Sequence, residues 1–172
     1  MSILCDAEIR ALCERGFLVQ PYLAELVNPA SIDVRLGTNL LVEKIGHHRM
    51  EPYSLEGFTQ EMPFYLAQGR FVLAETMETF NVPDDYAGQF ALKSSRAREG
   101  FEHLMAGYID PGFHGSKLTL ELCNARRYHP LVMWPGMRIG QIVWHRMSRV
   151  PAHSYRHVGR YNNDPKVQRS IG

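Results

Sequence analysis

Short runs of apolar residues, or of apolar and polar residues in alternation, follow one another along most of the chain. Gly, Pro, Asn and Asp separate these runs, and such close spacing favours many short strands over alternating strands and helices. The runs are SIDVRLG (31–37), LLVEKI (40–45), RFVLAETMETF (70–80), GQFAL (88–92), KLTLELC (117–123), LVMW (131–134) and RIGQIVWHRM (138–147). The pattern predicts an all-β sandwich or barrel, with tight turns at NVPDD (81–85) and WPGM (134–137).

The N-terminal segment CDAEIRALCERG (5–16) has a different period. Its apolar residues recur at helical spacing, at Ile9, Leu12 and Cys13. We expect Asp6 to cap the start of a short helix and Gly16 to end it.

The C-terminal stretch from about Pro151 is polar and has no period, which predicts a flexible tail or lid over residues 151–172. No internal repeat or linker divides the sequence. We therefore interpret residues 1–172 as one domain, and 172 residues with 45% hydrophobic content are enough for a substantial core.

Charge and cysteine content narrow the class of protein. The formal net charge is +1, from 19 basic and 18 acidic residues, which argues against binding of nucleic acid or anionic membranes through bulk charge. The three cysteines, Cys5, Cys13 and Cys123, form no CxxC pair, which suits a reducing compartment. Acids and arginines interrupt the first fifteen residues, so we expect no signal peptide or membrane span and a cytoplasmic protein.

The segment SSRAREG (94–100) is the first candidate for chemistry. Ser94 or Ser95 could cap a short helix whose free backbone N–H groups attract an anion, with Lys93, Arg96 and Arg98 close by. The segment could equally be an ordinary capped helix with arginines facing water and Gly100 as its end. From these residues alone both interpretations stay open.

Two further segments place carboxylates in unusual settings. In AGYIDPGFHG (106–115), a buried Asp110 could cap its own turn, or it could position a sugar hydroxyl or a water. In SKLTLELCN (116–124), strand alternation places Leu118, Leu120 and Leu122 on one face, and Thr119, Glu121 and Cys123 on the other. Glu121 could be a solvent-exposed edge residue, or it could face a cavity whose low polarity suits proton transfer.

Together these segments resemble the dCTP deaminase branch of the dCTP deaminase and dUTPase superfamily. In that branch SSxAR is followed by IDPGF or IDPGW, and then by LE with an asparagine three residues after the glutamate. This chain has SSRAR (94–98), IDPGF (109–113) and LELCN (120–124). The resemblance extends to about Met147 through PASIDVRLG (29–37), FVLAETMETFNVPDDYAGQF (71–90) and PGMRIGQI (135–142).

The resemblance implies a mainly β, distorted jelly-roll barrel of dUTPase-like type, with a short N-terminal helix and a helix after the central strands. It implies a homotrimer whose sites lie between neighbouring subunits, with dCTP as substrate and no nucleic acid or membrane partner. It also implies Mg²⁺ carried on the triphosphate and no catalytic zinc. Consistent with this, the His-x-Glu and Pro-Cys-x-x-Cys signature of zinc deaminases is missing from the sequence.

The resemblance assigns roles to individual residues. Glu121 would be the general base and acid, with Ser94 and Arg98 positioning the water and stabilising charge. Residues expected to bind the substrate are Lys93, Ser95 and Gln141 at the phosphates, Asp110 and Phe113 at the deoxyribose, and Thr119 on the face of Glu121. In the lid, Arg160 and Tyr161 stand where the family has a Lys-Tyr pair, and the expected glutamine is missing or displaced to Gln168.

The predicted reaction is hydrolysis of dCTP to dUTP and ammonia. One alternative is a bifunctional enzyme that gives dUMP and diphosphate, because AGYIDPGF resembles that version; another is a non-catalytic nucleotide-binding regulator. The chain departs from the family pattern by one residue fewer between Arg98 and Asp110, and by one more between Gly115 and Glu121. We expect the extra residue to form a bulge beside the site.

Overall fold

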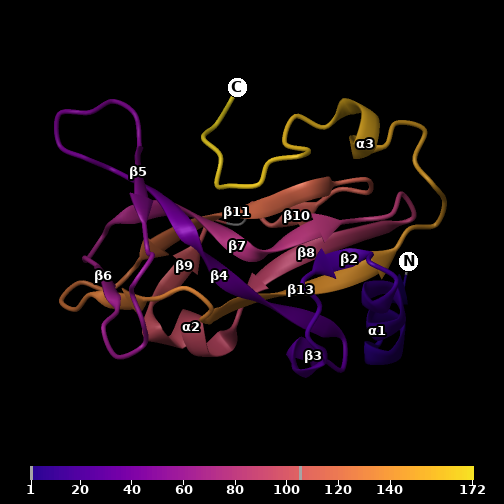
Figure 1. The fold of residues 1–172 in the computed structure, drawn as a ribbon, viewed down its shortest axis with the longest axis horizontal. Helices are drawn as coiled ribbons and strands as arrows, with labels where there is room; N and C mark the ends of the chain where they lie inside the picture. The colour runs from indigo at the N-terminus through magenta and orange to yellow at the C-terminus, as the bar shows by residue number, and fades with distance from the viewer. Residues whose placement is uncertain (1, 105) are drawn as a thin grey trace.

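A computed structural model describes residues 2–104 and 106–172 and shows one large, curled antiparallel sheet (Figure 1). Its order is β10–β8–β13–β4–β7–β11–β9. These strands are β4 (Ser31–Val42), β7 (Phe71–Asn81), β8 (Tyr86–Leu92), β9 (Phe101–His103), β10 (Tyr108–Ile109), β11 (His114–Asn124) and β13 (Arg138–Arg146). The predicted mainly β fold is confirmed.

Shorter elements surround this sheet. They are β1 (Ser2–Ile3), β2 (Leu18–Gln20), β3 (Val27–Asn28), β5 (Glu51–Ser54), β6 (Phe64–Leu66), β12 (Leu131–Met133), the 3-10 helix η1 (Ala24–Leu26), and the helices α1 (Asp6–Glu14), α2 (Ser94–Glu99) and α3 (Tyr155–Val158). Strands β6 and β12 form a separate pair. Within residues 2–104 and 106–172, none of the helices has the length and apolar character needed to cross a membrane.

Each predicted run lies in a strand, although two runs share one strand. SIDVRLG and the start of LLVEKI are halves of β4, which is continuous through Thr38 and Asn39. The turn at 81–85 leads from β7 to β8, which do not pair with each other but lie on opposite sides of β4 and β13. The turn at 134–137 joins β12 to β13, where Gly136 has φ +85°.

The N-terminal helix α1 is confirmed, and all three of its predicted core residues, Ile9, Leu12 and Cys13, are buried. Its cap differs from the prediction. Cys5 is the N-cap and Asp6 is the first helical residue, because the Glu8 carboxylate accepts the backbone N–H of Cys5 at 3.2 Å. Gly16 follows the helix with φ +83°.

A row of packed aromatic side chains extends the hydrophobic core from the centre of the sheet to the IDPGF loop. Trp144 of β13 is fully buried, and its ring centroid lies 6.3 Å from that of Phe80. The ring centroid of Phe80 lies 6.0 Å from that of Phe113, whose exposed fraction is 8%. Packing against the core therefore fixes the loop that carries Asp110.

Strand β11 is irregular where the sequence has its extra residue. Its pairing with β7 shifts register between His114 and Ser116 and again between Lys117 and Thr119. At the second shift, the backbone N–H of Leu118 donates to the side-chain hydroxyl of Thr76 at 3.0 Å instead of to a ladder carbonyl. The first shift has one more residue on β11 than on β7, so the predicted bulge is confirmed there, whereas the second shift has its extra residues on β7. Leu118 is partly buried against the core, and it also lines the cavity.

The C-terminal segment crosses over β11 after α3 (Figure 1). Hydrogen bonds hold it there: the hydroxyl of Ser116 donates to the carbonyl of Tyr161 at 2.6 Å, and the N–H of Lys117 donates to the carbonyl of Asp164 at 3.0 Å. The segment is therefore bound along β11, and its role as a flexible lid stays a prediction.

The three free cysteines differ in environment, which predicts different reactivity toward a thiol reagent. Burial raises the pKa of Cys13 to about 11, and burial with the nearby Glu102 carboxylate raises the pKa of Cys123. A raised pKa leaves little thiolate at pH 8. In a titration with 5,5′-dithiobis(2-nitrobenzoic acid) at pH 8, we expect exposed Cys5 to react at once and Cys13 only after unfolding. Rapid reaction of Cys13 in the folded protein would contradict its burial, and a Cys5→Ser variant identifies the fast thiol.

Candidate active site

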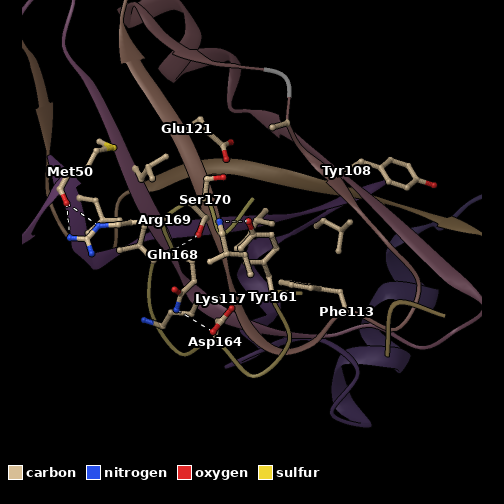
Figure 2. Close-up of a pocket in the computed structure, with 18 of the residues that line it drawn as sticks. Met50, Tyr108, Phe113, Lys117, Glu121, Tyr161, Asp164, Gln168, Arg169 and Ser170 are labelled. Carbon is tan, nitrogen blue, oxygen red and sulfur yellow. Dashed lines mark hydrogen bonds between the residues drawn. The ribbon is translucent and has the colours of Figure 1, made fainter. Parts of the chain in front are cut away.

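A cavity of about 1230 Å³ lies between β11, the IDPGF loop and the C-terminal segment (Figure 2). Predicted site residues from all three parts line it, namely Glu121, Asp110, Phe113, Thr119 and Tyr161. We call these the cavity group. Residues that the sequence did not single out complete the wall from the C-terminal segment and from β11, and include Asp164, Arg169 and Lys117.

Glu121 faces this cavity, which decides between the two interpretations of its strand face. Its side chain is 25% exposed, and its Oε2 atom lies 3.2 Å from Nε2 of His103. Both atoms are buried, and neither has a hydrogen-bond partner among residues 2–104 and 106–172. The Glu121 side chain lines the cavity, where a carboxylate is able to accept a proton from a bound water.

His103 is a neighbour of Glu121 that sequence reasoning missed. It lies on β9, which pairs with β11 so that His103 is opposite Leu122. Its ring also packs against Phe90, at a centroid distance of 4.6 Å. If the imidazole is protonated, its contact with Glu121 is an ion pair. No local motif marks His103, because its position depends on the pairing of β9 with β11.

The remaining members of the cavity group differ in their surroundings. Asp110 is exposed to the cavity, which corrects the expectation that it is buried. The hydroxyl of Thr119 accepts the backbone N–H of Gln168 at 3.1 Å. The hydroxyl of Tyr161 accepts the N–H of Ile171 at 3.3 Å. Thr119 and Tyr161 are therefore both engaged by the C-terminal segment.

A second set of predicted residues lies outside the cavity, around the buried carboxylate of Asp33. Nζ of Lys93 lies 2.8 Å and 3.0 Å from its two oxygens, and Nδ2 of Asn28 donates to it at 2.7 Å. Gln141 is paired with Asp33 across β13 and β4, and its Oε1 accepts the hydroxyl of Ser31 at 2.8 Å. The predicted phosphate ligands Lys93 and Gln141 therefore share one neighbourhood.

Helix α2 belongs to this second set. It starts at Ser94 directly after Lys93 and ends at Gly100, whose φ of 108° confirms the predicted stop. Neither Ser94 nor Ser95 caps it: Lys93 is the N-cap, and no side chain bonds to the first turn. Ser94, Ser95 and Arg98 are exposed, so their polar groups are available to a ligand or to another chain. We call Lys93, Ser94, Ser95, Arg98 and Gln141 the helix group.

The interpretation of the other α2 residues is also clear from their contacts. Arg96 forms an ion pair with Glu99 at 2.7 Å and is partly buried.

In the C-terminal segment, Arg160 is exposed and lies outside the cavity lining, whereas Gln168 lines the cavity.

The predicted site is therefore split within one chain. The cavity group contains the proposed proton carrier, and the helix group contains the residues expected at the phosphates and at the reacting water. Figure 1 draws α2 at the edge of the sheet opposite the C-terminal segment.

Among the side chains that the structure describes, no set is arranged as a metal cage. Over residues 2–104 and 106–172, no three His, Cys, Asp or Glu side chains gather closely enough to hold a metal ion. Lys93 and Asp33 instead neutralise each other beside α2.

Comparison with known proteins matches residues 3–147 to the family described as dCTP deaminase-like. The chain is 43% identical over 155 residues to the "dCTP deaminase, dUMP-forming" of Methanospirillum hungatei, with 86% of this chain and 83% of the relative covered. It is 39% identical over 163 residues to the protein of the same name from Mycobacterium sp. (strain KMS), with 89% and 85% covered.

A solved structure shows a similar fold. The 2′-deoxycytidine 5′-triphosphate deaminase from Agrobacterium tumefaciens superposes with a TM-score of 0.66 at 26% identity. The match covers 83% of this chain and 47% of that chain, so this protein spans about half the length of that deaminase.

Proposed function

Because this chain belongs to the dCTP deaminase family, we propose that it converts dCTP to dUMP, with release of ammonia and diphosphate. The observation that carries the proposal is the carboxylate of Glu121, which lines the cavity and lies beside the imidazole of His103 at 3.2 Å. Deamination to dUTP alone was the main expectation from the sequence. The names of the relatives at 43% and 39% identity favour the dUMP-forming alternative.

Deamination replaces the 4-amino group of cytosine by oxygen. Glu121 would take a proton from a water as the water adds to C4, and would pass this proton to ring nitrogen N3. It would then take the proton of the new C4 hydroxyl and deliver it to the amino group, which leaves as ammonia while C4 becomes a carbonyl. Ser94 and Arg98 of the helix group would hold the water and stabilise charge at the tetrahedral centre.

The phosphates would bind at the helix group, through Lys93, Ser95 and Gln141. Mg²⁺ would bind together with the triphosphate and neutralise part of its negative charge. In the cavity group, exposed Asp110 would hold the 3′-hydroxyl of deoxyribose and its local water, and Phe113 would pack against the sugar. A second water would then attack the α-phosphorus and break its bond to the oxygen shared with the β-phosphorus. This step releases diphosphate and leaves dUMP.

We propose a homotrimer in which each site joins the cavity group of one subunit to the helix group of its neighbour. The separation of the two groups within one chain supports this assembly. We also place the reaction in the cytoplasm, because the free thiols of Cys5, Cys13 and Cys123 suit a reducing compartment.

The test is product analysis after incubation with dCTP and Mg²⁺, with nucleotides resolved by ion-exchange chromatography and ammonia measured in parallel. We expect dUMP, diphosphate and ammonia in equal amounts. Accumulation of dUTP would contradict the cleavage step and leave deamination alone. No turnover of dCTP, dCMP or dUTP would contradict both steps and favour a nucleotide-binding regulator on the same fold.

A further inference from the structure

Glu75 is a fully buried carboxylate that the proposed reaction does not use. It lies in the middle of β7, opposite Thr119 of β11, and its exposed fraction is 0%. The neighbouring strand makes room for it at Gly37, where a Cβ atom would lie 2.5 Å from Cγ of Glu75. A buried carboxylate persists in a protein only when donors satisfy its oxygens, so its partners indicate its role.

The two oxygens of Glu75 have different partners. Oε1 accepts from Nδ2 of Asn39 and from Nζ of Lys117, both at 2.8 Å, and both donors belong to the sheet. Oε2 accepts the backbone N–H of Val167 at 2.9 Å, in a buried hydrogen bond. One oxygen is thus held by the body of the protein and the other by the C-terminal segment.

Val167 is a residue of the C-terminal segment whose side chain is buried. It is 9% exposed, whereas the nearby Lys166 and Arg169 are exposed. The next residue, Gln168, donates its N–H to Thr119, two residues before Glu121 on the same strand. Fixing Val167 therefore fixes the part of the segment that forms the wall facing Glu121 (Figure 2).

We propose that Glu75 is a positioning residue that anchors the C-terminal segment over the nucleotide cavity, with Lys117 as its counter-ion. This inference rests on the proposed function, because it assigns the closed segment to binding of dCTP. A hydrogen bond to a charged acceptor in a dry environment is stronger than the segment's bonds at the surface of β11. Loss of the hydrogen bond between Glu75 and Val167 should make the C-terminal segment, which forms one wall of the cavity, more mobile without moving Glu121.

The decisive variant is Glu75→Gln, with Glu78→Gln as its matched control. Glu78 is on the same strand and also 0% exposed, but its oxygens accept from the side chain and backbone of Arg35. A glutamine has a single acceptor oxygen, so it is unable to satisfy the N–H of Val167 and the donors of Lys117 and Asn39 together. Both variants remove a buried charge, and only one of them removes the anchor.

The first measurement is amide hydrogen exchange over residues 161–171 in the absence of nucleotide. We expect exchange of this segment to increase about tenfold in Glu75→Gln and by less than about twofold in Glu78→Gln. Equal loosening in the two variants, or wild-type exchange in Glu75→Gln, would overturn the anchor.

A second pair of variants tests the same bond from the segment. Val167→Pro removes the N–H donor and leaves the sheet intact, whereas Val167→Ala keeps the donor and trims the side chain. We expect faster exchange in Val167→Pro than in Val167→Ala. This pair keeps the proposal falsifiable if Glu75→Gln fails to fold.

Kinetics distinguish positioning from a purely structural role. We expect the KM for dCTP to rise about tenfold in Glu75→Gln while kcat stays within about threefold of the wild type. Unchanged KM with a loosened segment would overturn the positioning role. A wild-type protein that fails to turn over dCTP would refute the proposed function, and the exchange experiment would still decide the anchor.

Discussion

Replacement of Glu121 by glutamine is expected to lower kcat for deamination of dCTP roughly 1000-fold. Glutamine has the same shape but accepts no proton at neutral pH, so water activation and return of the proton to the leaving amine are lost together. Because glutamine keeps the shape of a side chain that lines the cavity beside His103, the change should disturb neither the fold nor the neighbouring strands. Steady-state release of ammonia, with KM for dCTP measured alongside, gives the result.

The matched control is Glu102→Gln, on the neighbouring strand β9. Glu102 is exposed and does not line the cavity, so its variant should deaminate at the wild-type rate. Cleavage of added dUTP by Glu121→Gln, if retained, would show that the phosphate site is intact. Deamination by Glu121→Gln at the wild-type rate would refute its role as general base.

Two inactive variants are expected to restore activity when their subunits are mixed. Arg98→Ala damages the helix group and Glu121→Gln damages the cavity group, so each homotrimer should be almost inactive. In a randomly mixed trimer, about a quarter of the sites would combine an intact helix group with an intact cavity group. Deaminase activity should therefore recover to about a quarter of the wild-type value after the subunits are exchanged.

The experiment requires dissociation and reassembly of the mixture, for example through mild denaturant, with each variant treated alone as a control. Recovery only in the mixture would support sites that span two subunits. Mixed trimers that form but stay inactive would show that each site is built within one chain, and the split between the two groups would then need a rearrangement of α2.

The long strands were predictable from the sequence because their apolar residues face a common core. Ile32, Val34 and Leu36 of β4 alternate along the strand and are all buried. The short strands β9 and β10 gave no such signal, since two or three residues contain no period. Their existence depends on pairing with β11 and β8, which the local sequence does not encode.

The site was predictable as far as its motifs are local. Glu121, Asp110 and Phe113 lie in contiguous segments with the family pattern, and the structure brings them to one cavity. His103 and Glu75 were missed because their partners are distant in the sequence. The contact between Glu75 and Val167 joins residues 92 positions apart, and no spacing rule reaches across that distance.

The alternation predicted for β11 is confirmed beyond its bulge. Leu120 and Leu122 are buried, Leu118 is partly buried against the same core, and Thr119 and Glu121 line the cavity. At the register shift after Lys117, three residues of β7 stand against one of β11, so the faces of β11 do not change. A motif with one additional residue therefore identifies both the strand and its two faces.

Phe113 belongs both to the aromatic core around Trp144 and Phe80 and to the wall of the cavity. Under the proposed function, substrate range and folding stability would therefore be coupled. Trimming Phe113 to alanine to admit a bulkier sugar would cost about 3–5 kcal/mol of folding free energy. An evolving or engineered enzyme would need compensating core substitutions before its pocket could widen, whereas the exposed Asp110 beside it is free to vary without that constraint.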